Sequence, residues 1–185
     1  QEKKRPYPLA KINNIVVKPI VKSFWEKGSN AKKILLPSAA MFPEEFFNVL
    51  LLAKKKTGKT STIFTILKNS IINTKKVKTI VIIYCNTVYK DKTWIAITNW
   101  LNEKGIPSVV NTSIHEDGAN TLDNILDVLG TPEATSDPAL PAINYIFIFD
   151  DISAELHEES IARLLKQNRH YRAKVIISTR LHGCN

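Results

Sequence analysis

The feature that most constrains this sequence is an apolar run that passes directly into a lysine-rich loop and then into a helical pattern. Residues 46–53, FFNVLLLA, have the apolar character of a strand covered on both faces of a parallel sheet. The loop that follows is AKKKTGKT, and apolar side chains then recur at helical spacing from Ile63. We therefore predict a strand, a tight loop and a helix over residues 59–72.

The loop matches the Walker A pattern GxxxxGK[ST], except that Ala53 stands at its first position. In this motif, backbone N–H groups at a helix N-terminus surround a phosphate. Gly58 lets the backbone approach the phosphates, Lys59 offsets the charge of the β- and γ-phosphates, and the Thr60 hydroxyl ligates Mg²⁺. Alanine is small enough for the turn but restricts positive φ. The nucleotide-binding residues predicted are Ala53, Lys54, Lys55, Lys56, Thr57, Gly58, Lys59, Thr60 and Ser61.

A second apolar run ends in two acids about ninety residues after that lysine. The run Ile146–Phe149 followed by Asp150 and Asp151 has the Walker B form. Asp150 would hold the Mg²⁺ shell directly or through water, and Asp151 would polarise the attacking water. Two aspartates at a strand end are also common in turns and helix caps. Paired with Walker A, they predict ATP and Mg²⁺ as cofactors, Thr60 and Asp150 as metal ligands, and Lys59 and Asp151 as catalytic residues.

Short apolar runs alternate with helical patterns along the rest of the chain. Further strands are expected at 78–85, 107–110, 143–151 and 173–179, and further helices at 91–105, 121–129 and 158–168. The acids follow an intervening strand and helix, which suggests the additional-strand P-loop class of motors and helicases. The predicted fold class is α/β: a P-loop NTPase with a mostly parallel five-stranded sheet and helices on both faces.

Two further groups of residues are functional candidates near the end of the chain. In the additional-strand class, the last strand ends in a polar residue that senses the γ-phosphate, and here it ends in Ser178, Thr179 and Arg180. Before it, the helix is basic toward its C-terminal end, so that Arg169 or Arg163 would act as an arginine finger on a neighbouring subunit's nucleotide. Favourable interaction with the helix dipole explains the same basic residues without a catalytic role.

The charge is distributed unevenly. Residues 1–45 are rich in Lys and Pro and are predicted to be a basic N-terminal extension, with the P-loop ATPase core at 46–185. Residues 1–60 carry 13 basic and 4 acidic side chains, whereas residues 114–160 carry 11 acidic and no basic ones. The basic part can attract phosphate backbones, although solvated lysines that only maintain solubility are an equal alternative. Phe24 and Trp25 either stack on bases or pack against the core.

Several classes of protein fit this sequence poorly. It has no apolar run of the roughly 20 residues that span a bilayer, and its first residues lack the apolar stretch of a signal peptide, so we expect a soluble, intracellular protein without membrane insertion. Cys85 and Cys184 form no metal-ligand spacing and are expected to be unpaired thiols. The four histidines are scattered without such spacing.

Four segments resemble the FtsK-HerA superfamily and, within it, the DNA-packaging ATPases of poxviruses, giant viruses and virophages. They are LLLAKKKTGKTS, YCNTVYKDKTW, IFIFDDIS and LLKQNRHYRAKVIIST, which together span about residues 46 to 179. The resemblance implies a ring of five or six subunits that couples ATP hydrolysis to threading double-stranded DNA into a preformed capsid, with a capsid or portal-like vertex as partner. It also implies a location in the viral factory of the host cytoplasm or in the virion.

The sequence departs from that family at its end. Arg180 stands where the family usually has glutamine, and the family usually continues well beyond the position of Asn185. We therefore expect either a truncated chain or a shortened relative. A helicase, another nucleic-acid-dependent P-loop ATPase, and a nucleotide-binding module without turnover remain as alternatives.

Overall fold

A computed structural model of the chain describes residues 42, 44–54, 57–131 and 140–179, together with the backbone of 11–12, 15–16 and 180. The chain divides into two units, Gln1–Ile34 and Leu35–Asn185. In the first unit, β1 (Lys11–Ile12) pairs antiparallel with β2 (Ile15–Val16). The predictions for Phe24 and Trp25 lie outside the described residues.

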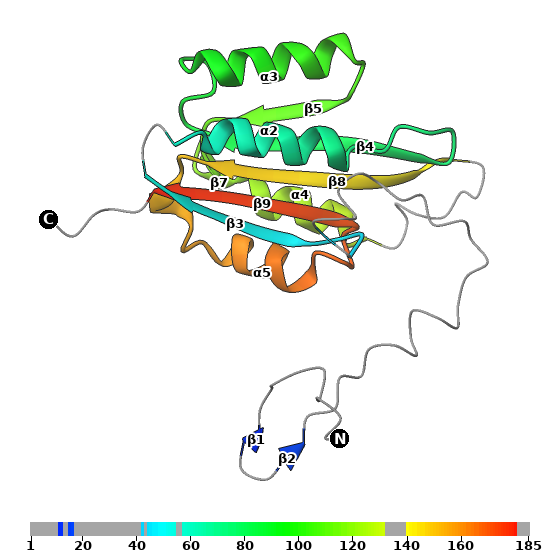
Figure 1. The fold of residues 1–185 in the computed structure, drawn as a ribbon. Coiled ribbons are helices and arrows are strands. Elements are labelled where there is room, and N and C mark those ends of the chain that lie inside the picture. Colours follow the sequence, from blue (N-terminus) through cyan, green and yellow to red (C-terminus); the bar gives the residue numbers. More distant parts are fainter. Residues whose placement is uncertain are drawn as a thin grey trace, which may run out of the picture. The chain divides into compact units, whose positions relative to one another are not determined.

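The second unit is built on a five-stranded parallel sheet with the order β3-β9-β8-β4-β5 (Figure 1). The strands are β3 (Asn48–Ala53), β4 (Val77–Cys85), β5 (Ser108–Asn111), β8 (Ala142–Asp150) and β9 (Ala173–Arg180). Strand β9 therefore lies between β3, which precedes the lysine-rich loop, and β8, which carries the two acids. This arrangement confirms the predicted fold class, including the additional strand.

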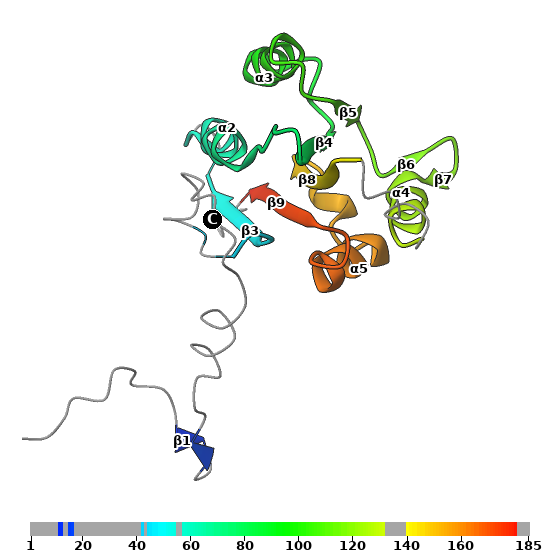
Figure 2. The same cartoon turned by 90° about the vertical axis from the view of Figure 1, so that its right-hand side faces the viewer.

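Helices cover both faces of the sheet (Figure 2). On one face lie α2 (Lys59–Ser70) and α3 (Lys92–Glu103), and on the other lie α4 (Thr121–Leu129) and α5 (Glu159–Gln167). Each pair of helices packs against the sheet around a separate hydrophobic core. The core beneath α2 and α3 contains Ile63 and Trp94, and the core beneath α4 and α5 contains Leu122 and Leu164. Since both faces are covered, the central strands consist of nearly continuous apolar residues, as the sequence predicts for a parallel sheet.

The apolar side chains of the helices face these two cores. Trp94, Ile97 and Leu101, which recur at helical spacing on α3, are all fully or almost fully buried. Among the described residues, no helix combines the length and the apolar character needed to cross a bilayer.

One small element lies between the predicted strand at 107–110 and the predicted helix at 121–129. The strands β6 (His115–Glu116) and β7 (Ala119–Asn120) form a hairpin whose turn is Asp117–Gly118, both with positive φ. Asp-Gly is a strong signal for such a turn, because both positions tolerate positive φ. The Glu155 carboxylate, in the short 3-10 helix η3 (Ser153–Glu155), accepts hydrogen bonds at the base of this hairpin from the Ser113 hydroxyl at 3.0 Å and the Ile114 amide at 2.6 Å.

Candidate functional site

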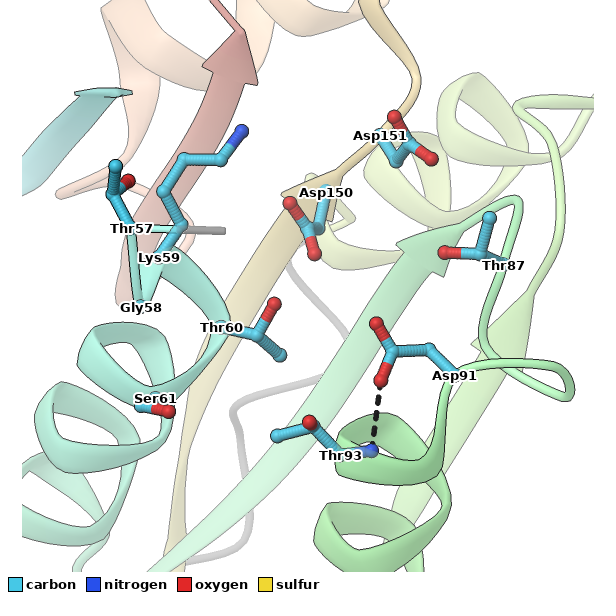
Figure 3. A pocket seen from close by; sticks show the side chains of 10 residues that line it. All are labelled: Thr57, Gly58, Lys59, Thr60, Ser61, Thr87, Asp91, Thr93, Asp150 and Asp151. Atoms are coloured by element: carbon cyan, nitrogen blue, oxygen red, sulfur yellow. Dashed lines mark hydrogen bonds between the residues drawn. The ribbon is translucent and has the colours of Figure 1, made fainter. Parts of the chain in front are cut away.

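A cavity of about 310 Å³ lies at the carboxyl ends of the parallel strands, where open α/β sheets place their ligands (Figure 3). One wall is the loop after β3 with the first turn of α2, and the other consists of the loop after β4 and the end of β8. The lining residues are Thr57, Gly58, Lys59, Thr60, Ser61, Thr87, Asp91, Thr93, Asp150 and Asp151.

The lysine-rich loop leaves the N-terminus of α2 open to this cavity. Gly58 is the N-cap of α2 with φ +85°, a left-handed conformation that side chains with a Cβ rarely adopt. Glycine at the N-cap has no side chain to cap the helix, and the first amide that donates to the N-cap carbonyl is that of Thr62, so the amides of Lys59, Thr60 and Ser61 have no intrahelical acceptor. Within the loop, the Thr57 hydroxyl donates a hydrogen bond to the Lys54 carbonyl oxygen at 2.7 Å. The exposed amides and the helix dipole together suit an anion such as phosphate.

A second helix N-terminus borders the same cavity but is already capped. Asp91 is the N-cap of α3, and its Oδ1 accepts a hydrogen bond from the Thr93 amide at 2.8 Å. The two helix N-termini therefore differ. The Asp91 carboxylate accepts a hydrogen bond from an amide of α3, whereas no N-cap side chain does so for α2. An anion in the cavity is expected to bind at α2.

Lys59 extends along the floor of the cavity toward β9. Its Nζ donates to the main-chain carbonyl oxygen of Thr179 at 3.2 Å, near the end of that strand. The Thr179 hydroxyl is also 3.2 Å from the hydroxyl of Ser153, which follows the two acids. The ammonium group thus lies beside the carboxyl end of β9, and Lys59 is one of the residues that line the cavity.

The two acids have different surroundings. Asp150 is the last residue of β8 and only 6% exposed, and its Oδ2 accepts a hydrogen bond from Nε1 of the fully buried Trp94 at 2.8 Å. Asp151 lies one residue beyond the strand with φ +58°, a left-handed conformation in which Asp and Asn are enriched among non-glycine residues. The change of backbone conformation between them turns the two side chains in different directions (Figure 3).

The charge of the lining favours a metal cation together with an anionic ligand. Among the ten lining residues, three are aspartates and one is a lysine. A phosphate group beside these carboxylates would be repelled unless a cation lay between them. The Thr60 hydroxyl and the Asp150 carboxylate supply the hard oxygen donors that Mg²⁺ prefers, and the cavity is large enough for the waters this ion keeps. The donor set therefore fits Mg²⁺.

Cys85 lies beneath the cavity and does not add a nucleophile to it. It is the register partner of Asp150 in the sheet and is fully buried. Burial raises the pKa of its thiol to about 11, with the charges of Asp150 and Asp151 contributing in the same direction and hydrogen bonds with Thr87 opposing. The thiol is consequently neutral near pH 7, and it is a free cysteine as predicted.

The structure brings most of the predicted site residues together in the cavity, namely Thr57 to Ser61, Asp150 and Asp151. Ala53 and Lys54 precede the lining residues, and Lys55 and Lys56 lie outside the described residues. Their roles in binding and catalysis stay predictions.

Neither candidate arginine finger lines the cavity. Arg169, after α5, forms an ion pair with Glu44 near the amino ends of the strands. Arg163 joins α5 to α4, because its guanidinium contacts the Asp127 carboxylate at 2.7 Å and donates to the Tyr171 hydroxyl at 3.1 Å. A role for either arginine in a neighbouring subunit's site stays a prediction.

Part of the second wall consists of residues that were not predicted from the sequence. Thr87, Asp91 and Thr93 line the cavity and Trp94 supports it, and none of the four is among the predicted site residues. Polar residues directly after the buried strand β4 were an available signal, since all parallel strands end at the same edge of the sheet. The indole contact to Asp150 has no counterpart in local sequence, because 56 residues separate the two side chains.

These features define the class of the fold as a P-loop NTPase of the additional-strand type. No protein-family model matches the sequence, and no curated protein matches it. Among solved structures, the cytoplasmic domain of the type VII secretion ATPase EccC from Thermomonospora curvata is similar, with a TM-score of 0.45 and 14% identity. The match covers 74% of this chain but 16% of that one, and a likeness of this size carries no argument about activity or partners.

Proposed function

We propose that this chain binds ATP together with Mg²⁺ and hydrolyses it. The observation that supports this most directly is that Lys59 and Thr60 share one cavity with Asp150 and Asp151. Phosphoryl transfer needs little covalent chemistry from the protein, and its catalysis consists of positioning and charge stabilisation. The cavity offers a group for each of these tasks.

In the proposed reaction, the amides at the start of α2 hold the phosphate chain, and Lys59 leaves the Thr179 carbonyl to contact the β- and γ-phosphates. Thr60 and Asp150 would hold Mg²⁺, which when bound neutralises charge on the phosphate oxygens. Asp151 orients the water that attacks the γ-phosphorus and accepts its proton as the bond to the β-phosphate oxygen breaks. The products are ADP and phosphate.

We further propose that hydrolysis drives the movement of double-stranded DNA into a viral capsid. The similarity of four sequence segments to packaging ATPases supports this, as does the excess of basic side chains in residues 1–60 and 161–185. Such a motor contacts backbone phosphates and does not discriminate between bases, because it must accept every sequence. Its setting would be the viral factory or the virion, with a capsid or portal-like vertex as partner.

The same proposal includes a ring of five or six copies, in which Arg169 of one subunit reaches the nucleotide of the next. In that case Arg169 would exchange its ion pair with Glu44 for the nucleotide's phosphates. Mixing Arg169→Ala chains with Asp151→Asn chains tests this arrangement. Turnover in the mixture that exceeds the turnover of either variant alone supports a finger acting between subunits, because a site with an intact Asp151 then receives an intact Arg169 from its neighbour. A mixture with no such recovery contradicts it.

Phosphate release measured with and without duplex DNA, over a series of salt concentrations, tests the wider proposal. Stimulation by duplex DNA that weakens steeply with salt is expected, because binding releases counterions from the backbone. A strand-displacement assay separates the alternatives: unwinding favours a helicase, and stimulation without unwinding favours a translocase. ATP binding with no turnover under any condition would favour a nucleotide-binding module.

A further inference from the structure

The contact between Trp94 and Asp150 joins a core side chain to the cavity. Trp94 lies in the first turn of α3 and is 0% exposed, and its indole N–H donates to Oδ2 of Asp150 at 2.8 Å. The two neighbours of Trp94 in this turn that line the cavity are Asp91 and Thr93. One turn of α3 thus contributes to the cavity wall and also holds the acid opposite α2.

In this hydrogen bond the indole of Trp94 can only be the donor, and the Asp150 carboxylate is the acceptor. The plane of the carboxylate is therefore oriented by the indole. A carboxylate that is 6% exposed is costly to bury unless such donors compensate for its lost hydration. Because Oδ2 of Asp150 accepts the hydrogen bond from Trp94, we expect Oδ1 to be the oxygen that binds a cation in the cavity.

We propose that Trp94 is a positioning residue for Asp150, which sets the orientation in which this carboxylate meets Mg²⁺. The inference rests on the proposed function, because it concerns the cation that accompanies the nucleotide. Trp94 itself touches neither nucleotide nor cation. Partners that orient metal ligands in this way change metal affinity or activity by about 10- to 100-fold when they are removed.

Trp94 also fills the core between the sheet and α3, so a test must separate shape from hydrogen bonding. Benzothienylalanine, which replaces the indole N–H by sulfur, keeps the shape and removes the donor. Trp94→Phe is the second variant, made by simple mutagenesis, and it removes the N–H donor together with part of the ring volume. Trp100→Phe is the matched control, because Trp100 lies on the same helix, packs edge-on against Phe64 and lies outside the cavity lining.

The first measurement needs no turnover. In protein with ¹⁵N-labelled tryptophan, the Trp94 indole N–H is expected to exchange slowly with solvent. Asp150→Ala should shift the Trp94 indole signal and leave the Trp100 signal unchanged, and adding MgCl₂ with ADP should shift the Trp94 signal in the wild type. A Trp94 signal that is unaffected by Asp150→Ala would overturn the contact on which the inference depends.

The second measurement is the MgCl₂ concentration that half-saturates ADP binding, followed by calorimetry, with the same titration repeated for ATP turnover. Benzothienylalanine at position 94 should raise this concentration about 10-fold or more, while Trp100→Phe leaves it unchanged. Wild-type binding with an unchanged Mg²⁺ requirement in the isostere overturns the Trp94 inference alone. A wild-type protein that binds no Mg²⁺-nucleotide overturns the proposed function, and the cation role of Trp94 with it.

Discussion

The Nζ of Lys59 donates to the main-chain carbonyl oxygen of Thr179 at 3.2 Å, which links the start of α2 to the end of the additional strand β9. Thr179 is in register with Leu52 on β3, so the lysine folds back over the two strands that support its own loop. A carbonyl oxygen holds an ammonium group less strongly than phosphate does, since hydrogen bonds between two charged groups are stronger. The lysine is therefore placed to exchange this carbonyl for a nucleotide.

Lys59→Met should weaken ATP binding by at least about 10-fold and abolish turnover, because one charged contact to phosphate contributes roughly 1.5–3 kcal/mol. The free energy of unfolding should change by only about 1 kcal/mol, since the lost bond to Thr179 is a single partly exposed hydrogen bond. Calorimetric titration measures the affinity for ATP, phosphate release measures turnover, and urea unfolding measures the free energy of unfolding. Lys68→Met, in the last turn of the same helix and outside the cavity lining, is the control and should bind ATP normally.

Asp151→Asn should retain ATP affinity and lose turnover by about 100-fold or more, since general-base contributions are of this size. Asparagine tolerates the left-handed conformation at φ +58° that Asp151 adopts, so this variant should fold with nearly wild-type stability. Asp151→Val, with its branched Cβ, should in addition lower the melting temperature. Wild-type turnover in Asp151→Asn would remove Asp151 from the proposed mechanism.

Gly58→Ala should cost roughly 1–2 kcal/mol of stability and also weaken ATP binding, because an alanine at φ +85° strains the turn that presents the α2 amides. Gly105, which follows α3 at φ +61° and lies outside the cavity lining, offers a matched comparison. Gly105→Ala should lose a similar amount of stability while ATP binding stays at the wild-type level. Equal losses of binding in both variants would mean that instability alone explains the effect.

The stability of the protein should depend on pH through a buried lysine far from the cavity. Lys174, at the start of β9, is 1% exposed, and its Nζ donates to the Ser70 carbonyl at the end of α2 at 2.7 Å. Burial lowers the pKa of this lysine from its ordinary 10.5 to about 8, although the charge of Glu45 opposes the shift. Between these two values the unfolded chain binds the proton that the folded chain has released, so raising the pH favours the folded state.

The measurement is urea unfolding of the wild type and of Lys174→Met at several pH values from 8 to 10.5. The difference in unfolding free energy, wild type minus variant, should increase over this interval by up to roughly 3 kcal/mol. Tyrosine and cysteine titrations occur in both proteins and cancel in the difference. A difference that stays constant with pH would show that Lys174 keeps its ordinary pKa in the folded protein.

Local sequence predicted the elements that carry their own signal. The apolar runs before Ala53 and before Asp150 both appear as parallel strands within one or two residues of the expected limits. Burial on both faces explains the run in the central strand β8. The same expectation was wrong for β3, because this strand lies at the edge of the sheet and its Leu50 and Leu52 side chains are 58% and 53% exposed. The loop at Gly58 was recognisable because its conformation requires glycine there. The Asp117–Gly118 hairpin carried a similar local signal that the sequence reasoning overlooked.

Other features depended on contacts between distant parts of the chain. The sequence by itself determined that a phosphate-binding loop and a pair of acids are present, since each is a short pattern of residue types. The additional strand was expected from the order of the motifs, and the tertiary structure identified it as β9, between β3 and β8. Only the tertiary structure decided that Lys59 contacts Thr179 and that Trp94 holds Asp150. Strand order and these two hydrogen bonds arise from the packing of helices onto a shared sheet, and residues that meet there are tens of positions apart, beyond the reach of any local pattern.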